Sequence, residues 1–213
     1  MRHWFFDLDG TLADTDADTR GAWKATLSDL GIDCPRFDEE FVTGPPIGEI
    51  AKKLFPERYD PAFDRILREG FAGHYDNDGM PLTREYPGML DEVRRLKAAG
   101  DRVYIATNKR MAGTRVIAEK FGWNGIFDGI YAGDMHKDDA IGILRKPELL
   151  ALIMKERGAR AEECVMVGDT INDFEAARAN GIVSIGMAWG YGTEAELLEA
   201  DIVCRSLPLP SIR

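Results

Sequence analysis

The sequence contains few cysteines and lacks any apolar run that is long enough to cross a membrane. Among its 213 residues are only three cysteines, Cys34, Cys164 and Cys204, which lie far apart and form no Cys-x-x-Cys pair. Nothing therefore indicates a zinc site or a thiol redox site of that kind. The apolar start, Met1–Phe6, is interrupted at once by Asp7. We expect neither a signal peptide nor a membrane span there, and hence a cytoplasmic protein.

The chain also has fewer basic residues than acidic residues. The chain has 27 Lys and Arg residues against 37 Asp and Glu residues, which gives a formal net charge of -10 at pH 7. Nucleic acid and anionic membranes are therefore not expected partners. The histidines, His3, His74 and His136, have no mutual spacing that is typical of a metal site. An anionic substrate would need local positive charge, supplied by a metal ion, a lysine or backbone amides.

Short apolar runs that end in a polar or glycine-rich turn recur along the chain. Their length and their content of Val, Ile, Phe and Tyr are typical of buried strands. They are His3–Phe6, Arg102–Ala106, Gly129–Ala132, Cys164–Val167, Val183–Ala188 and Asp201–Cys204. Helical patterns alternate with the later runs, at Met89–Ala99, Ala112–Phe121, Pro147–Arg157 and Phe174–Ala179. This alternation predicts an α/β fold, with a doubly wound parallel sheet that is covered by helices on both faces.

The segment from about Asp14 to Glu85 departs from this alternation. It shows no convincing buried strand, and prolines divide it. Its helical patterns are Thr19–Leu30, Ile47–Phe55 and Pro61–Tyr75. We therefore predict a core domain formed by residues 1–14 and 86–213, with a small helical domain of residues 15–85 inserted after the first strand.

Polar residues follow several of the predicted strands directly. They are Asp7, Asp9 and Thr11 after the first strand, Thr107 and Asn108 after the second, and Asp169 and Asp173 after the fourth, with Lys146 ahead of the preceding helix. Ligands bind at the carboxyl ends of the strands in an open parallel sheet, so we expect these groups at one edge. Each group alone also fits a turn, a helix cap or a solvated lysine. Those separate interpretations do not explain the order in which the groups occur.

This order resembles the motifs of the haloacid dehalogenase (HAD) superfamily, and within it those of the phosphoglycolate phosphatase group. The superfamily's motifs are matched in turn by Asp7, Asp9 and Thr11, by Thr107, by Lys146, and by Asp169 and Asp173. The segment Trp189-Gly190-Tyr191-Gly192 is similar to the phosphoglycolate phosphatase group in particular. The resemblance implies a Rossmann-like core with a helical cap between the first and second motifs.

The resemblance also implies a chemistry, namely Mg²⁺-dependent hydrolysis of small phosphate monoesters through an aspartyl-phosphate. Asp7 would be the nucleophile, and Asp9 would be the general acid and base. Mg²⁺ would be bound by the side chains of Asp7 and Asp169 and by the backbone carbonyl of Asp9. Asp173 would support the metal as a further ligand or through another ligand.

The remaining motif residues would bind the phosphoryl group. Lys146 would supply a point charge, while the Thr107 hydroxyl and the backbone amides of Leu8 and Asn108 would donate to the phosphoryl oxygens. The helical cap would exclude water and select the leaving group. The segment from Thr43 to Ile47 resembles the specificity loop of such a cap, although a plain turn between helices is the preferred interpretation.

Several other functions stay open. A β-phosphoglucomutase-like phosphotransferase has the same acids and cap type, although it commonly carries valine where Thr11 stands. A pyrophosphatase is another enzyme alternative. The non-enzyme alternatives are a phospho-receiver domain, which has no long helical insertion, and a silent binding module, which usually lacks the nucleophile or a metal acid. The sequence does not identify the substrate or the oligomeric state.

Overall fold

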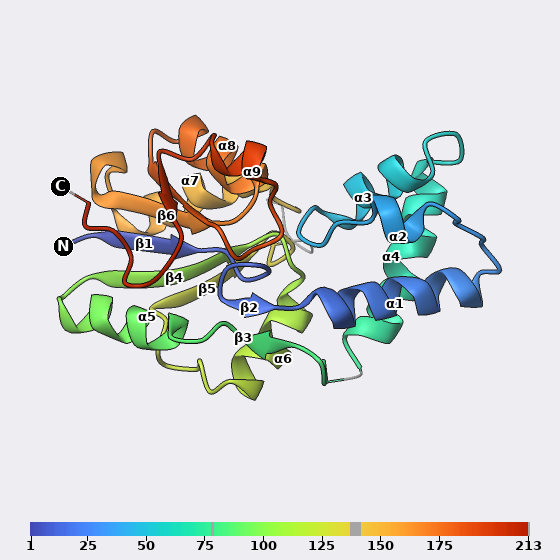
Figure 1. The fold of residues 1–213 in the computed structure, drawn as a ribbon, viewed down its shortest axis with the longest axis horizontal. Coiled ribbons are helices and arrows are strands. Elements are labelled where there is room, and N and C mark those ends of the chain that lie inside the picture. The colour runs from blue at the N-terminus through green and yellow to red at the C-terminus, as the bar shows by residue number, and fades with distance from the viewer. Residues whose placement is uncertain (78, 137–141, 213) are drawn as a thin grey trace.

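The computed structural model describes residues 1–77, 79–136 and 142–212. Its core is a six-stranded parallel sheet with the strand order β5-β4-β1-β6-β7-β8 (Figure 1). The strands are β1 (His3–Phe6), β4 (Arg102–Thr107), β5 (Gly129–Ala132), β6 (Cys164–Gly168), β7 (Val183–Met187) and β8 (Ile202–Cys204). The predicted α/β fold with a parallel sheet is confirmed.

Helices cover both faces of this sheet (Figure 1). One face packs against α5 (Met89–Ala98) and α6 (Met111–Lys120), and the other against α7 (Lys146–Arg157) and α8 (Ile171–Ala179). Successive side chains of a strand point to opposite faces. In β1, Trp4 and Phe6 accordingly join the first layer and Phe5 joins the second. This two-sided burial explains why the strand is apolar throughout. A 3-10 turn (Ala161–Glu163) and α9 (Glu194–Leu197) lie in the later connections.

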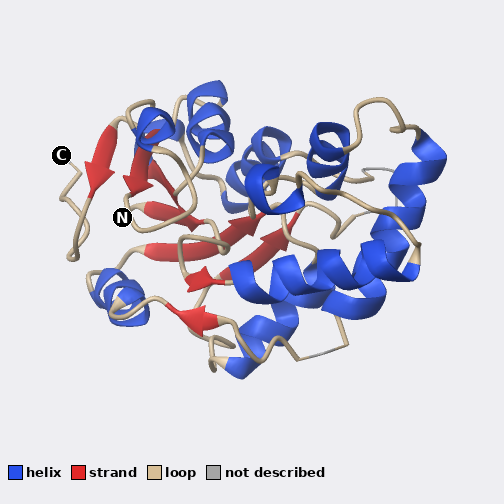
Figure 2. Ribbon diagram, turned by 45° about the vertical axis from the view of Figure 1, so that its right-hand side comes forward, coloured by secondary structure: helices blue, strands red, loops and turns tan. Residues whose placement is uncertain are grey.

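A group of helices inserted after the first strand lies to one side of the sheet (Figures 1 and 2). It consists of α1 (Asp16–Asp29), α2 (Phe37–Glu40), α3 (Ile47–Leu54) and α4 (Pro61–Tyr75). The rings of Trp23 and Phe71 pack α1 against α4 with their centroids 5.9 Å apart. The side chain of Asp60 caps α4 by accepting a hydrogen bond from the backbone of Phe63 at 2.7 Å.

The two connections between the helical group and the core run side by side. They form a short antiparallel pair, β2 (Ala13–Asp14) with β3 (Arg84–Glu85). The sequence analysis did not predict this pair, because two-residue strands leave no periodic pattern. The pair holds the start and the end of the insertion next to each other at the edge of the core.

The structure also bears on the cysteines and on membrane insertion. All three cysteines are free, and Cys164 and Cys204 are buried. Throughout the described residues, every helix is too short or too polar to cross a bilayer.

Candidate active site

The carboxyl ends of three strands meet at one edge of the sheet. Strand β1 pairs in parallel with β4 on one side and with β6 on the other. Asp7 leaves β1, Thr107 ends β4 and Asp169 follows β6. The backbone N–H of Asp7 donates to the carbonyl of Val167 at 2.9 Å, which continues the ladder into the first motif. The parallel sheet thus brings residues that are far apart in the chain to a common edge.

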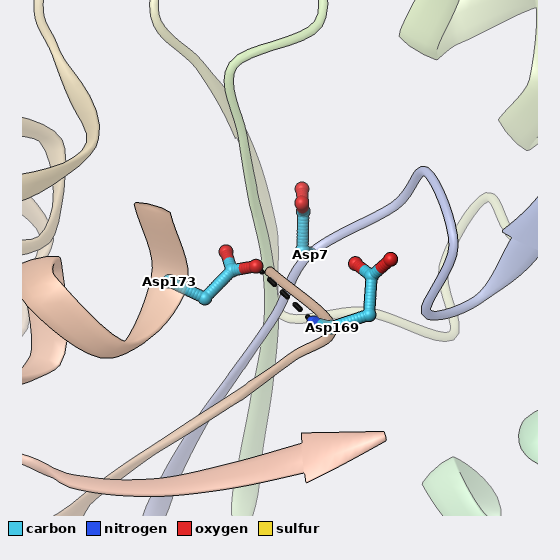
Figure 3. A group of neighbouring side chains, drawn as sticks. All are labelled: Asp7, Asp169 and Asp173. Atoms are coloured by element: carbon cyan, nitrogen blue, oxygen red, sulfur yellow. Dashed lines mark hydrogen bonds between the residues drawn. The ribbon is translucent and has the colours of Figure 1, made fainter. Parts of the chain in front are cut away.

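Three carboxylates gather there, those of Asp7, Asp169 and Asp173 (Figure 3). One oxygen from each lies within 4.8 Å of the others, and all three residues are buried. Asp173 belongs to the first turn of α8, where its Oδ2 accepts from the backbone N–H groups of Asp169 at 3.2 Å and Thr170 at 3.1 Å. These hydrogen bonds at the start of α8 therefore fix this carboxylate at the same edge of the sheet.

Lys146 lies between two of these carboxylates. It is the first residue of α7, and its side chain is only 2% exposed. Its Nζ lies 2.9 Å from Oδ2 of Asp7 and 2.5 Å from Oδ1 of Asp173. Burial acts to lower the pKa of Lys146, but the carboxylates of Asp173 and Asp7 outweigh it and raise the pKa. The lysine is therefore a buried cation.

The cluster is short of positive charge. Three carboxylates face one ammonium group, so two negative charges are unbalanced when all groups are ionised. Burial raises the pKa of Asp7 from its ordinary 3.8 to about 6, with Asp173 and Asp9 adding to the rise and Lys146 opposing it. Burial, followed by the charges of Asp173 and Asp7, also raises the pKa of Asp169 well above its ordinary value. A set of carboxylate oxygens with this deficit fits a divalent cation such as Mg²⁺.

Asp9 lies outside the cluster. Its Oδ1 accepts hydrogen bonds from the Thr15 hydroxyl at 2.6 Å and from Nζ of Lys109 at 2.7 Å. The Lys109 ammonium also lies 4.5 Å from the ring centroid of Tyr75 in α4. Burial acts to lower the pKa of Lys109, but Asp9 and Tyr75 raise it overall. The carboxylate predicted to be the general acid is thus bound by one side chain from the core and one from the start of the helical group.

Sequence reasoning missed Lys109 as a site residue. No pattern in the sequence distinguishes it from a solvated lysine. Its side chain is 7% exposed. One signal was available, because Lys109 lies two residues beyond Thr107 and thus in the same strand-end loop as a predicted phosphate ligand.

The predicted phosphate-binding groups lie around Asp7. The backbone N–H of Leu8 donates to Oδ1 of Asp7 at 2.7 Å. Thr107 is buried, and its hydroxyl oxygen accepts from the backbone N–H of Lys109 at 3.1 Å. Asn108 is half-buried and lines a cavity beside the site. A hydroxyl group and a backbone amide thus lie at this edge of the sheet, and the amide of Leu8 is bound to the carboxylate of Asp7.

Two glycines allow other loops to approach Asp169 closely. A Cβ atom at Gly10, whose φ is +74°, would lie 2.0 Å from Oδ2 of Asp169. A Cβ atom at Gly190 would lie 2.2 Å from the Cβ atom of Asp169. Next to Gly190, the backbone N–H of Tyr191 donates to Oδ2 of Asp169 at 2.7 Å. The loop after β7, noted in the sequence for its Trp-Gly-Tyr-Gly segment, therefore packs directly on a predicted metal ligand.

A cavity of about 430 Å³ separates this edge from the helical group. Asp9, Asn108 and Lys109 line it from the core. The whole Thr43–Ile47 loop, which precedes α3, lines it as well. Lys52 also lines the cavity. Three further cationic residues do so as well, Arg68, Arg110 and Arg145.

Comparisons with known proteins identify the family of this chain. Residues 4–187 match the family model of the haloacid dehalogenase-like hydrolases. A 5'-nucleotidase from Pseudomonas aeruginosa is 31% identical over 90% of this chain and 85% of its own length. A phosphoglycolate phosphatase from Agrobacterium fabrum is 31% identical over 93% of this chain and 85% of its own length. The crystal structure of a predicted phosphatase from Clostridium acetobutylicum has the same fold, with a TM-score of 0.85 at 24% identity over 96% of this chain and 94% of that one. The chain belongs to the haloacid dehalogenase-like hydrolase family and is a phosphatase of that family.

Proposed function

We propose that the protein hydrolyses small phosphate monoesters with the help of Mg²⁺, by way of an aspartyl-phosphate on Asp7. One observation carries this proposal, namely the buried cluster of Asp7, Asp169 and Asp173 around Lys146 at the carboxyl end of β1. The cluster combines a nucleophilic carboxylate, a cation that can meet phosphoryl oxygens and an excess of oxygen ligands for a metal.

The side chains of Asp7, Asp169 and Asp173 would hold Mg²⁺, together with the backbone carbonyl of Asp9. Their shared deficit of positive charge and their buried oxygen donors support this assignment. The bound metal would neutralise charge, so that a carboxylate can approach a phosphate dianion.

The chain's own residues then divide the reaction into two steps. In the first step, a carboxylate oxygen of Asp7 attacks phosphorus, the bond from phosphorus to the leaving oxygen breaks, and Asp9 donates a proton to that oxygen. In the second step, Asp9 accepts a proton from water, which attacks phosphorus and breaks its bond to Asp7. Lys146, Thr107 and the backbone amides of Leu8 and Asn108 stabilise the phosphoryl oxygens throughout.

We also propose that residues 1–14 and 86–213 form the core domain and that residues 15–85 form a cap over the cavity. The position of the Thr43–Ile47 loop on the cavity wall supports a role in choosing the leaving group. Curated phosphoglycolate phosphatases among the similar proteins favour small monoesters of that kind as substrates. The free thiols agree with a cytoplasmic location.

Release of phosphate from p-nitrophenyl phosphate tests the proposal, with Mg²⁺ and with a chelator. We expect metal-dependent release that falls by on the order of 10³-fold or more in Asp7→Asn. Asp91→Asn is a matched control, because its side chain is 82% exposed and remote from the cluster. Phosphoglycolate and nucleoside monophosphates then screen for the substrate.

Two outcomes would contradict the proposal. Equal release by the wild type and Asp7→Asn would mean that Asp7 is not the nucleophile. An isomerised sugar phosphate with little free phosphate would instead identify a phosphotransferase.

A further inference from the structure

The first helix of the inserted group begins without a cap of its own. Thr15 occupies the N-cap position of α1, yet its side chain accepts no hydrogen bond from the first turn. Threonine at this position ordinarily caps the helix by accepting from a backbone N–H group. Here the Thr15 hydroxyl instead donates to Oδ1 of Asp9 at 2.6 Å. The residue that would cap α1 thus holds the proposed general acid.

The hydroxyl of Tyr191 takes over the capping role. It accepts from the backbone N–H groups of Thr15 at 2.6 Å and Asp16 at 3.0 Å, and it donates to Oδ1 of Asp14 at 2.8 Å. These three contacts place one phenol oxygen against consecutive residues at the entry to α1. The backbone N–H of the same tyrosine donates to Asp169. A single residue of the loop after β7 therefore connects a proposed metal ligand with the turn that carries Thr15.

We infer that Tyr191 is a positioning residue for the general acid, because its hydroxyl fixes Thr15 and Thr15 in turn holds the carboxylate of Asp9. This inference rests on the function proposed above for Asp9. It assigns a role to the Trp-Gly-Tyr-Gly segment, which the proposed chemical steps leave without one. The contact with Thr15 also ties the start of the helical group to the core at the point where the chain leaves β2.

Removing the hydroxyl of Tyr191 should lower the rate only in part. Lys109, which follows β4, donates from Nζ to the same oxygen of Asp9 at 2.7 Å, and this contact does not depend on Tyr191. General acid catalysis contributes roughly 10²- to 10⁴-fold to a rate, so loss of one of two holding contacts should cost about ten-fold. The loss should appear only where the leaving oxygen needs a proton, which is the case for an alkoxide and much less so for p-nitrophenolate.

The test is the variant Tyr191→Phe, which keeps the ring and removes only the hydroxyl. Release of the leaving group is measured in single turnovers, which report the first step alone, for an alkyl phosphate and for p-nitrophenyl phosphate. We expect about a ten-fold loss with the alkyl ester and less than a two-fold loss with the aryl ester. Amide hydrogen exchange at Thr15 should accelerate in the same variant, because its N–H group loses its acceptor, whereas the N–H of Asp16 keeps a contact with Oδ1 of Asp14 at 3.2 Å.

Tyr131→Phe is the matched control. Its hydroxyl also has two partners, Arg157 at 2.9 Å and Glu156 at 3.1 Å, and these lie at the C-terminal end of α7, away from Asp9. Tyr131→Phe should change neither the ratio of the alkyl-ester rate to the aryl-ester rate nor the hydrogen exchange at Thr15. Thr15→Val tests the same route independently. It should reproduce the dependence on the leaving group, and adding Tyr191→Phe to it should cause no further loss.

Equal losses with both esters, or no loss with either, would overturn the inference. Asp9→Asn separates this failure from failure of the proposed function. If Asp9→Asn slows the alkyl ester selectively and Tyr191→Phe does not, only the role of Tyr191 is wrong. If Asp9→Asn shows no such selectivity, Asp9 is not the general acid, and the inference about Tyr191 is refuted with it.

Discussion

Removing the charge of Asp7 should stabilise the metal-free protein at neutral pH, although it should abolish activity. Burial raises the pKa of Asp7 from 3.8 to about 6. One pKa unit corresponds to ~1.4 kcal/mol, so ionised Asp7 costs the folded protein about 3 kcal/mol at pH 7. The variant Asp7→Asn avoids this cost and keeps a side chain of nearly the same shape. For a domain of this length, a gain of that size corresponds to a rise in Tm of roughly 6–12 °C.

The effect has a defined pH window. Between pH 3.8 and about 6 the folded state holds a proton on Asp7 that the unfolded state has lost. The free energy of unfolding of the wild type therefore falls, through this group, as the pH rises across that window. Asn at the same position does not titrate. The advantage of the variant should shrink from about 3 kcal/mol at pH 7 to less than about 1 kcal/mol near pH 4.

Urea unfolding in a chelator at pH 4, 5, 6 and 7 measures this difference directly. Asp91→Asn, at an exposed position, should match the wild type at every pH. Mg²⁺ should make the wild type more stable than the variant at pH 7. A ligand that binds only the folded wild type raises its free energy of unfolding with the logarithm of the ligand concentration relative to Kd. A variant that is less stable than the wild type in chelator at pH 7, or a difference that does not change with pH, would refute this account of the buried cluster.

Three other changes test separate parts of the site. Lys146→Met leaves two buried carboxylates without their cation, so the free energy of unfolding in chelator should fall by about 3–5 kcal/mol in urea titrations; a loss below about 1 kcal/mol would contradict this. Gly190→Ala places a Cβ atom 2.2 Å from the Cβ atom of Asp169, so calorimetry should show Mg²⁺ binding weakened by roughly 10- to 100-fold. Gly73→Ala, where the added atom meets nothing within 4 Å, should leave binding unchanged, and equal effects would argue against steric displacement. Lys109→Met removes one of the two contacts that hold the general acid, so kcat should fall by about ten-fold with little change in KM, and an unchanged kcat for an alkyl phosphate would oppose that role.

Much of the core could be predicted because its signals are local. The buried runs gave the strands to within a residue or two, and His3–Phe6 and Gly129–Ala132 are observed with the predicted bounds. Parallel pairing then brings the strand ends together, so the meeting of Asp7 with Asp169 follows from topology alone. The predicted start of a helix is wrong where capping residues determine it. Helix α8 begins at Ile171 rather than Phe174, since Thr170 is its N-cap and Asp173, a site acid in its first turn, accepts from the backbone N–H of Thr170.

The connections across the site could not be predicted in the same way. Tyr191 contacts the backbone of Thr15 across a separation of 176 residues, and Lys109 contacts Asp9 across 100. Neither pair has a periodic pattern or a spacing that would mark it. Both depend on where the inserted helices sit relative to the strand ends, and this position is set by the packing of many side chains rather than by any one segment. A tyrosine in a glycine-rich loop and a lysine after a strand look like surface residues until that packing is known.

The pairing of the buried lysines explains why a phosphatase of this net charge would depend on a metal. Lys146 is matched by two carboxylates and Lys109 by Asp9, so both cations are already engaged before any substrate arrives. A phosphate dianion that enters the metal-free site meets an excess of carboxylate charge, and repulsion in a buried site is strong. A divalent cation at the carboxylate cluster would offset that excess and leave Lys146 free to interact with phosphoryl oxygens. The carboxylates that destabilise the metal-free fold are thus the groups expected to make phosphate binding conditional on the metal.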